Sequence, residues 1–259
     1  MPIRIAVIAE AEADRRQICE TIDRKILSHA PDWLDAEQLE TERIYCGLLP
    51  NTIFTKWAEL RDIPKVSGAP RSGIIGFNEG QNRRFDYPLG RKALIHCALA
   101  HPRIDAAVLV RDMDQQHAER TASLAQARSE VSEAAMRVVL ALPRAKREAW
   151  VLNGFVPLTK SEKRRYEDIR SKLSFDPCEC SEELHAMKEG ATRDAKRVLA
   201  ELIGKDLNRE DRFEREARCW RATEWKILRE RGKESGLARF LEDVKEHLVP
   251  LVTGNARPN

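Results

Sequence analysis

Residues 107–114 constrain the fold of this chain more than any other stretch, because an apolar run ends there in two aspartates one residue apart. Such a run is typical of a strand in a parallel sheet, which is covered on both faces. Residues i and i+2 of an extended segment point to the same side, so Asp112 and Asp114 can present two carboxylates to one hard cation. Open α/β sheets place their ligands at the carboxyl ends of the strands. The stretch therefore predicts a buried strand with a functional site at its end.

Apolar runs and amphipathic stretches alternate along the first 160 residues. Strands are predicted at residues 3–9, 107–110 and 136–142, with a weaker one at 44–50. Helices are predicted at residues 14–30, 52–60, 91–101 and 115–134. This alternation predicts an α/β fold in which a parallel sheet carries helices on both faces.

The remainder of the chain has a helical pattern. Helices are expected at residues 191–203, 211–231 and 236–251, and no convincing strand follows Lys160. We therefore expect an α/β domain over residues 1–157, a mostly helical region over 158–253 and a disordered tail over 254–259.

Residues 63–90 are rich in glycine and proline, which predicts a long loop. Loops of this length are usually functional or disordered. Arg71, Arg83 and Arg84 lie in it. Basic residues near a carboxylate site suit a phosphodiester substrate, because they neutralise the charge of its backbone. A solvated helix face is the alternative interpretation of such a cluster.

Acidic residues follow three of the predicted strands. Glu10 follows the first strand, Asp112 and Asp114 follow the central one, and Glu148 lies six residues past the strand at 136–142. If these strands are neighbours, the four carboxylates can converge on one edge of the sheet. Such a cluster is expected to bind Mg²⁺ or Mn²⁺, which can orient a water and stabilise charge on a phosphoryl group. Each acid alone could instead be a helix cap or a turn residue.

The first of these strand ends resembles a motif of the Toprim superfamily, which includes topoisomerases, primases and OLD-type nucleases. The motif commonly reads Val-Glu-Gly-x-Thr-Asp, and Glu10 and Asp14 lie in register with it. Ala11 and Ala13 stand in place of its glycine and threonine.

Two further stretches extend the resemblance to roughly residues 3–155. Asp112 and Asp114 are similar to the Asp-x-Asp pair that ends a later strand of the superfamily. Residues 147–152, which contain Glu148, are similar to a Glu-x-Trp-x-Leu signature in a poorly characterised Toprim-like family of bacterial defence loci. The resemblance implies a Toprim-like parallel sheet followed by a helical tail.

The resemblance also implies a function, that of a divalent-metal-dependent nuclease cleaving DNA or RNA. Its setting would be antiphage defence, with an ATPase as a possible partner protein. The implied metal ligands are Glu10, Asp112 and Asp114, with Glu10 also a possible general acid or base and Glu148 a further ligand or orienting group. The expected substrate contacts are Arg71, Arg83, Arg84 and Arg111.

Two other functions stay open. The chain could be a non-catalytic Toprim-like subunit that binds a partner protein through its helical tail, and the substitutions at Ala11 and Ala13 favour this alternative. A flavodoxin-like receiver with an acidic pocket also places carboxylates at strand ends.

Composition restricts the class of protein and its expected location in the cell. No apolar run approaches the roughly 20 residues of a membrane-spanning helix, and no signal-peptide pattern precedes the first strand, so a cytoplasmic protein is expected. The net charge of +3 is too small to indicate nucleic-acid binding by itself. The six cysteines are scattered, which favours reduced thiols over a disulfide framework.

Overall fold

The computed structural model describes residues 1–63, 86–113, 116–131, 136–186 and 188–254. Asp114 and most of the predicted loop, including Arg71, Arg83 and Arg84, lie outside these residues, as does most of the predicted tail. The chain forms two compact units. The first comprises residues 1–111, 118–141 and 240–259, and the second comprises residues 112–117 and 142–239. The predicted domain boundary at residue 157 falls inside the second unit and stays a prediction.

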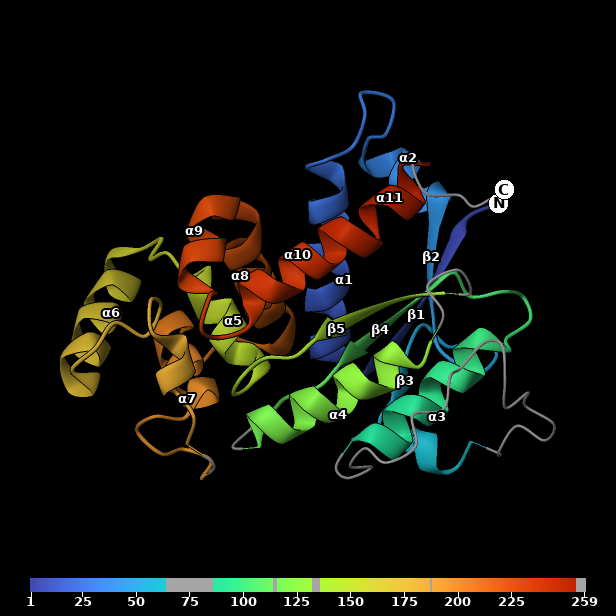
Figure 1. The fold of residues 1–259 in the computed structure, drawn as a ribbon. Coiled ribbons are helices and arrows are strands. Elements are labelled where there is room, and N and C mark those ends of the chain that lie inside the picture. Colours follow the sequence, from blue (N-terminus) through green and yellow to red (C-terminus); the bar gives the residue numbers. More distant parts are fainter. Residues whose placement is uncertain (64–85, 114–115, 132–135, 187, 255–259) are drawn as a thin grey trace. The chain divides into compact units, whose positions relative to one another are not determined.

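A five-stranded parallel sheet organises the first unit (Figure 1). Its strands are β1 (Ile3–Ala9), β2 (Arg43–Cys46), β3 (Thr55–Lys56), β4 (Ala106–Val110) and β5 (Arg137–Ala141). The order is β2-β1-β4-β5, and β3 pairs with the end of β1. Ile8 lies opposite Leu109, so the first predicted strand and the central one are neighbours. The predicted α/β class with a parallel sheet is confirmed.

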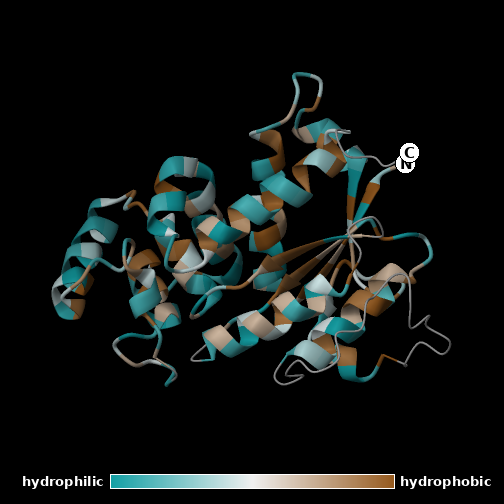
Figure 2. Cartoon of the chain, in the orientation of Figure 1, coloured by the Kyte–Doolittle hydropathy of each residue, from teal (hydrophilic) through white to brown (hydrophobic). Residues whose placement is uncertain are grey.

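Helices cover both faces of this sheet, as the alternating pattern predicts. In Figure 1, α3 (Tyr87–Ala98) and α4 (His117–Ser129) lie on one face, whereas α1 (Glu12–Leu27) and α11 (Val249–Val252) lie on the other. All five residues of β4 are buried. The central strands are accordingly among the most hydrophobic elements of the chain in Figure 2. The short helices α2 (Ala36–Glu42) and η1 (Glu59–Arg61) and most of α10 (Leu237–His247) complete the unit.

Two local predictions for the first unit were wrong. The helix predicted at residues 52–60 is instead β3 followed by η1, because Thr55 and Lys56 pair with the end of β1 and tertiary pairing outweighs local propensity. The chain is already helical at Tyr87, within the predicted loop. Pro88 is compatible with this start because the N–H groups of a first helical turn have no intrahelical partner.

The second unit is helical, which confirms the predicted character of the C-terminal region. It contains α5 (Arg147–Asn153), α6 (Lys160–Leu173), η2 (Ser181–Glu183), α7 (Ala195–Ile203), α8 (Arg209–Ala222) and α9 (Trp225–Arg231). The buried side chain of Asn153 ties α5 to its surroundings, since it donates to Cys178 O and Ser181 Oγ and accepts from Ser235 Oγ. Its amide is thus satisfied on both ends, as a buried polar group requires.

Two further expectations can be compared with the structure. None of the helices in the described part of the chain is long and apolar enough to cross a membrane. All six cysteines carry free thiols, as the sequence predicts.

Candidate functional site at the carboxyl edge of the sheet

The connections of the sheet change direction at β1. From β1 the chain passes through α1 to β2 on one side, and it later passes through α3 to β4 on the other side. Open α/β sheets bind ligands outside the carboxyl ends of the strands at such a switch point. Here the switch point lies between β1 and β4, and the first residues beyond these two strands are Glu10 and Arg111.

Glu10 and Arg111 form an ion pair at this point. Arg111 Nη1 donates to Glu10 Oε1 over 2.9 Å. The strand register explains the contact, because two residues beyond the paired Ile8 and Leu109 lie Glu10 and Arg111. The Glu10 side chain is 38% exposed and that of Arg111 is 20% exposed, so the pair lies where a ligand from solvent can reach it.

Two residues that the sequence analysis missed extend this pair into a row of alternating charges. Arg111 Nη2 lies 3.3 Å from Asp86 Oδ1, and Arg120 Nε lies 3.6 Å from Asp86 Oδ2. Asp86 immediately precedes α3 and is only 6% exposed. No sequence signal marked Asp86, because it lies in the glycine- and proline-rich segment and meets Arg111 only through the fold.

The hydrogen bonding of this row is incomplete. Asp86 Oδ2 and Arg111 Nε are buried and have no hydrogen-bond partner among the described residues. A buried polar atom without a hydrogen bond costs roughly 1–3 kcal/mol, so each such atom in a folded protein needs a physical explanation.

Trp57 supports Arg111 from the side of β3. Its indole Nε1 donates to Val110 O, the last carbonyl of β4, over 2.6 Å. The guanidinium of Arg111 lies 5.4 Å from the centre of the Trp57 ring, within the range of a cation–π interaction. The ring is buried, so it offers Arg111 a rigid apolar surface on the protein side.

Asp112 and Glu148 belong to the second unit, and both contact Arg147. Asp112 Oδ1 accepts from Arg147 N over 3.0 Å, at the first residue of α5. This carboxylate satisfies one of the unpaired N–H groups of the helix start and complements its positive end. The guanidinium of Arg147 lies 3.2 Å from Glu148 and 2.7 Å from Glu216. Asp112 therefore has a helix-capping contact, the alternative that the sequence left open.

The predicted site residues are thus distributed as follows. Glu10 and Arg111 meet in the first unit, Asp112 and Glu148 meet at Arg147 in the second, and Asp114, Arg71, Arg83 and Arg84 lie outside the described residues. Their joint role in one site stays a prediction.

The donor types fit a hard divalent cation, since each predicted ligand is a carboxylate. Arg111 donates to Glu10 Oε1, whereas no hydrogen bond from a described residue to Oε2 of the same carboxylate is present. Glu10 can therefore offer one oxygen to a cation without releasing Arg111.

A second group with metal-ligand chemistry lies on α10. Oxygen and nitrogen atoms of Asp243, Glu246 and His247 lie within 4.8 Å of one another. The guanidinium of Arg128 already contacts Asp243 over 2.6 Å and also contacts His247. Asp243 Oδ2 accepts from Leu140 N as well, on β5. The guanidinium of Arg128 is thus the counterion of this group, and the hydrogen bond from Leu140 N to Asp243 connects α10 to β5 at the edge of the sheet.

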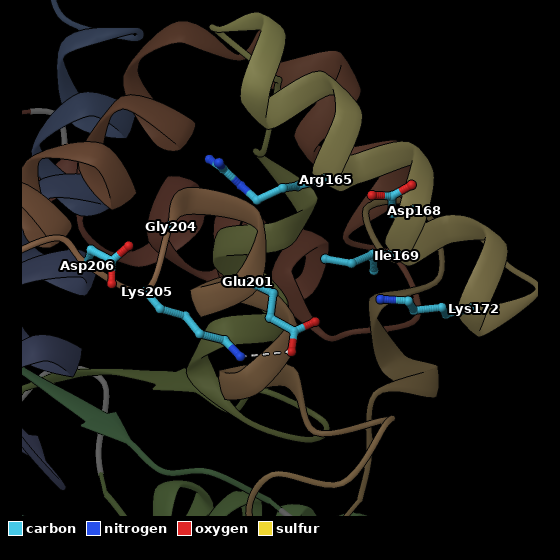
Figure 3. Close-up of a pocket in the computed structure, with 8 residues that line it drawn as sticks. All are labelled: Arg165, Asp168, Ile169, Lys172, Glu201, Gly204, Lys205 and Asp206. Atoms are coloured by element: carbon cyan, nitrogen blue, oxygen red, sulfur yellow. Dashed lines mark ion pairs between the residues drawn. The ribbon is translucent and has the colours of Figure 1, made fainter.

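The second unit contains a hollow of about 320 Å³ beside α6 and the end of α7. Its lining, drawn in Figure 3, combines three cationic and three acidic side chains: Arg165, Lys172, Lys205, Asp168, Glu201 and Asp206. Glu201 pairs with Lys205 over 3.2 Å. Arg165 Nε donates to Leu202 O and so satisfies a carbonyl at the end of α7. The lining has no net charge, and Arg165 has a structural role.

Comparison of the chain with protein-family models, curated proteins and solved structures finds no match.

Proposed function

We propose that this chain is a divalent-metal-dependent nuclease of Toprim type that cleaves phosphodiester bonds of DNA or RNA. The position of Glu10 carries the proposal. Glu10 follows β1 at the switch point of the sheet, beside β4, and the chain continues from β4 through Arg111 into Asp112. A glutamate after the first strand and an acidic pair after the adjacent strand form the arrangement that the Toprim resemblance requires.

Each residue has a role in this proposal. Glu10, Asp112 and Asp114 would hold Mg²⁺ or Mn²⁺, which supplies Lewis-acid activation of a water and neutralises charge on the phosphoryl group. If Asp112 and Asp114 hold the metal without Glu10, Oε2 of Glu10 would instead accept a proton from that water. Glu148 would orient the acidic cluster. Arg111 would bind the phosphodiester, and Arg71, Arg83 and Arg84 would contact neighbouring phosphates. The setting would be antiphage defence in the cytoplasm, with an ATPase as partner protein.

A second function has one observation in its favour. Both predicted ligands with described contacts already have structural partners, because Asp112 accepts from the start of α5 and Glu10 pairs with Arg111. A non-catalytic subunit that binds a partner protein would retain these acids for stability alone.

Cleavage by purified protein separates the two functions. We expect degradation of plasmid DNA or of RNA with Mg²⁺ or Mn²⁺, and a loss of about a hundredfold or more in Glu10→Gln and in Asp112→Asn. The Asp112→Asn change keeps an oxygen that can accept from Arg147 N, so α5 keeps its contact. Glu12→Gln, on the adjacent first turn of α1, is the control and should cleave normally.

Metal binding provides the second measurement. Calorimetry should detect Mn²⁺ binding to the wild type, and bound metal should raise its melting temperature by mass action. The absence of both cleavage and heat of binding at millimolar metal, with and without nucleic acid, would contradict the nuclease proposal and favour the partner-binding subunit.

A further inference from the structure

We propose that the start of α6 is a contact surface for the backbone of a nucleic-acid strand, with Lys160, Lys163 and Arg164 as its phosphate-binding residues. These three residues form the basic surface of α6. The inference rests on the proposed function in one respect, since it takes the strand to be the substrate of the same protein. It adds three cations of the second unit that the proposed site does not include.

The packing of α6 determines which of its side chains face solvent. Ile169 and Leu173 are buried, and the buried carboxylate of Glu162 lies 2.8 Å from Arg215 on α8. The residues of the basic surface are three and four positions apart, so they share the opposite side of the helix, where all three are exposed. The packed helix therefore holds the three cations on one rigid face.

The basic surface of α6 lacks acidic partners. None of its side chains forms an ion pair or a hydrogen bond with the part of the chain that the structure describes. Glu162, the carboxylate in the first turn of the helix, is occupied by Arg215. Glu167 and Asp168, one turn further along, form no ion pair with the basic surface. The surface thus has an excess of positive charge that no described carboxylate balances.

The position of these cations disfavours the helix itself. The N-terminus of a helix carries a partial positive charge, so acids are stabilising there and cations are stabilising at the other end. Lys160 and Arg164 are four residues apart, a spacing at which like charges destabilise a helix. A bound polyanion relieves both effects, because it brings several negative charges to one helical turn. A nucleic-acid strand carries such a charge at every nucleotide.

A membrane fits this surface less well than a strand does. A helix that lies on a membrane inserts an apolar face between the lipids. Ile169 and Leu173, the aliphatic residues of α6, are instead buried within the protein. Val156 and Leu158 are exposed in the preceding segment, but they do not belong to the helix and so do not form such a face.

A hydroxyl group beside the cations also suits a phosphate. Ser161 is exposed, and its Oγ accepts a hydrogen bond from Arg165 Nη1. The hydroxyl therefore keeps its own proton to donate to a phosphate oxygen. Serine hydroxyls are among the groups that contact phosphates in protein–DNA complexes.

Fluorescence anisotropy of a labelled single-stranded oligonucleotide in EDTA tests the surface without metal or cleavage. Replacing all three residues of the basic surface by glutamine should weaken binding roughly a hundredfold at about 0.1 M salt, and should reduce the slope of log K against log salt by about two units, since each phosphate contact on a single strand contributes about 0.7. The matched control replaces Arg193, Lys196 and Arg218 by glutamine. These exposed cations of the same unit already pair with acids, so the control should bind as the wild type does.

Equal binding by the wild type and the variant of the basic surface would overturn the proposal. Equal losses in that variant and in the control would do the same, as would the absence of oligonucleotide binding by the wild type. If the variant does not fold, as judged by circular dichroism, Lys163→Gln alone decides, because it should reduce the salt slope by about 0.7 units. An unchanged slope in Lys163→Gln would contradict the assignment.

Two other polyanions distinguish the partner. Polyglutamate stands for an acidic protein, and vesicles of equal parts phosphatidylcholine and phosphatidylserine stand for a membrane. A loss of binding in the variant of the basic surface that is confined to either of these would assign the surface to that partner and contradict the link to nucleic acid. Failure of the nuclease proposal appears separately, in the cleavage and metal-binding measurements.

Discussion

Several buried charges among the described residues are matched in closely spaced ion pairs, and the pair between Glu162 and Arg215 in the second unit is one example. Arg215 Nε lies 2.8 Å from Glu162 Oε1, and both side chains are at least nine-tenths buried. Glu162 also accepts from Leu158 N, and the guanidinium lies 4.9 Å from the centre of the Phe155 ring. Burial by itself would raise the pKa of Glu162, but the hydrogen bonds from Arg215 and Leu158 lower that pKa overall. The carboxylate is therefore charged in the folded protein and contributes to its stability.

The ion pair between Glu162 and Arg215 makes the free energy of unfolding depend on pH. A carboxyl group whose pKa is lowered on folding stabilises the protein above its ordinary pKa of 4.5, and this contribution is lost as the pH falls through the lower, folded value. We expect Glu162→Gln to cost about 3 kcal/mol at neutral pH, because Arg215 stays buried without its partner. Urea unfolding from pH 7 to pH 3 should show this difference shrinking below about pH 4.5. Glu167→Gln, at an exposed position of the same helix, is the control, and a difference that is constant with pH would contradict the assignment.

At the scale of elements, close approach between segments determines where helices begin and end. Gly154 ends α5 where a Cβ atom would lie 2.4 Å from Cys219 O on α8. Gly236 precedes α10 with φ +89°, and a Cβ atom there would lie 2.8 Å from Leu142 O. Only glycine meets both demands at Gly236, because a side chain is disfavoured at this φ and has no room.

Replacing Gly236 and Gly190 by alanine in two separate variants should separate the cost of the positive φ from the cost of the missing space. Gly190 also has a positive φ, of +78°, but a Cβ atom there would meet nothing within 4 Å. Gly190→Ala therefore measures the conformational cost alone, about 1 kcal/mol. We expect Gly236→Ala to cost a further 1–3 kcal/mol or so, because the Leu142 carbonyl must move. Chemical denaturation of both variants measures this difference, and equal losses would show that the backbone conformation alone requires glycine.

At the scale of the whole molecule, the two ends of the chain build one unit. The sheet comes from the first 141 residues, but residues from Phe240 onward belong to the same unit, and α11 contacts α1. The buried apolar side chains of this returning segment are Phe240, Leu241, Val244, Leu248, Val249, Leu251 and Val252. Each contributes roughly 1.5–3 kcal/mol by burial, so their sum is comparable to the 5–15 kcal/mol by which a typical domain is stable.

Removing residues 240–259 should therefore unfold the sheet unit. We expect the truncated protein to lose its cooperative thermal transition and to bind a dye specific for exposed apolar surface. Leu241→Ala should give a graded loss of about 2–5 kcal/mol, whereas Lys245→Ala, exposed on the same helix, should stay within about 0.5 kcal/mol of the wild type. A truncated protein with wild-type stability would show that the sheet does not depend on this segment.

The sequence by itself determined the class of the fold and the position of its strong strands. The runs that became β1, β4 and β5 are predictable because burial on both faces leaves a continuous apolar signature, and the edge that holds Glu10 and Arg111 follows from the parallel order. The short β3 was not predictable, because Thr55 and Lys56 are extended only through their pairing with β1.

The partners of the candidate site were decided by the tertiary structure alone. Asp86 reaches Arg111, and Asp112 meets Arg147, through packing between segments that are separated along the chain. Charge pairing depends on distance in space, and the order of residues records that distance only within one helix or strand.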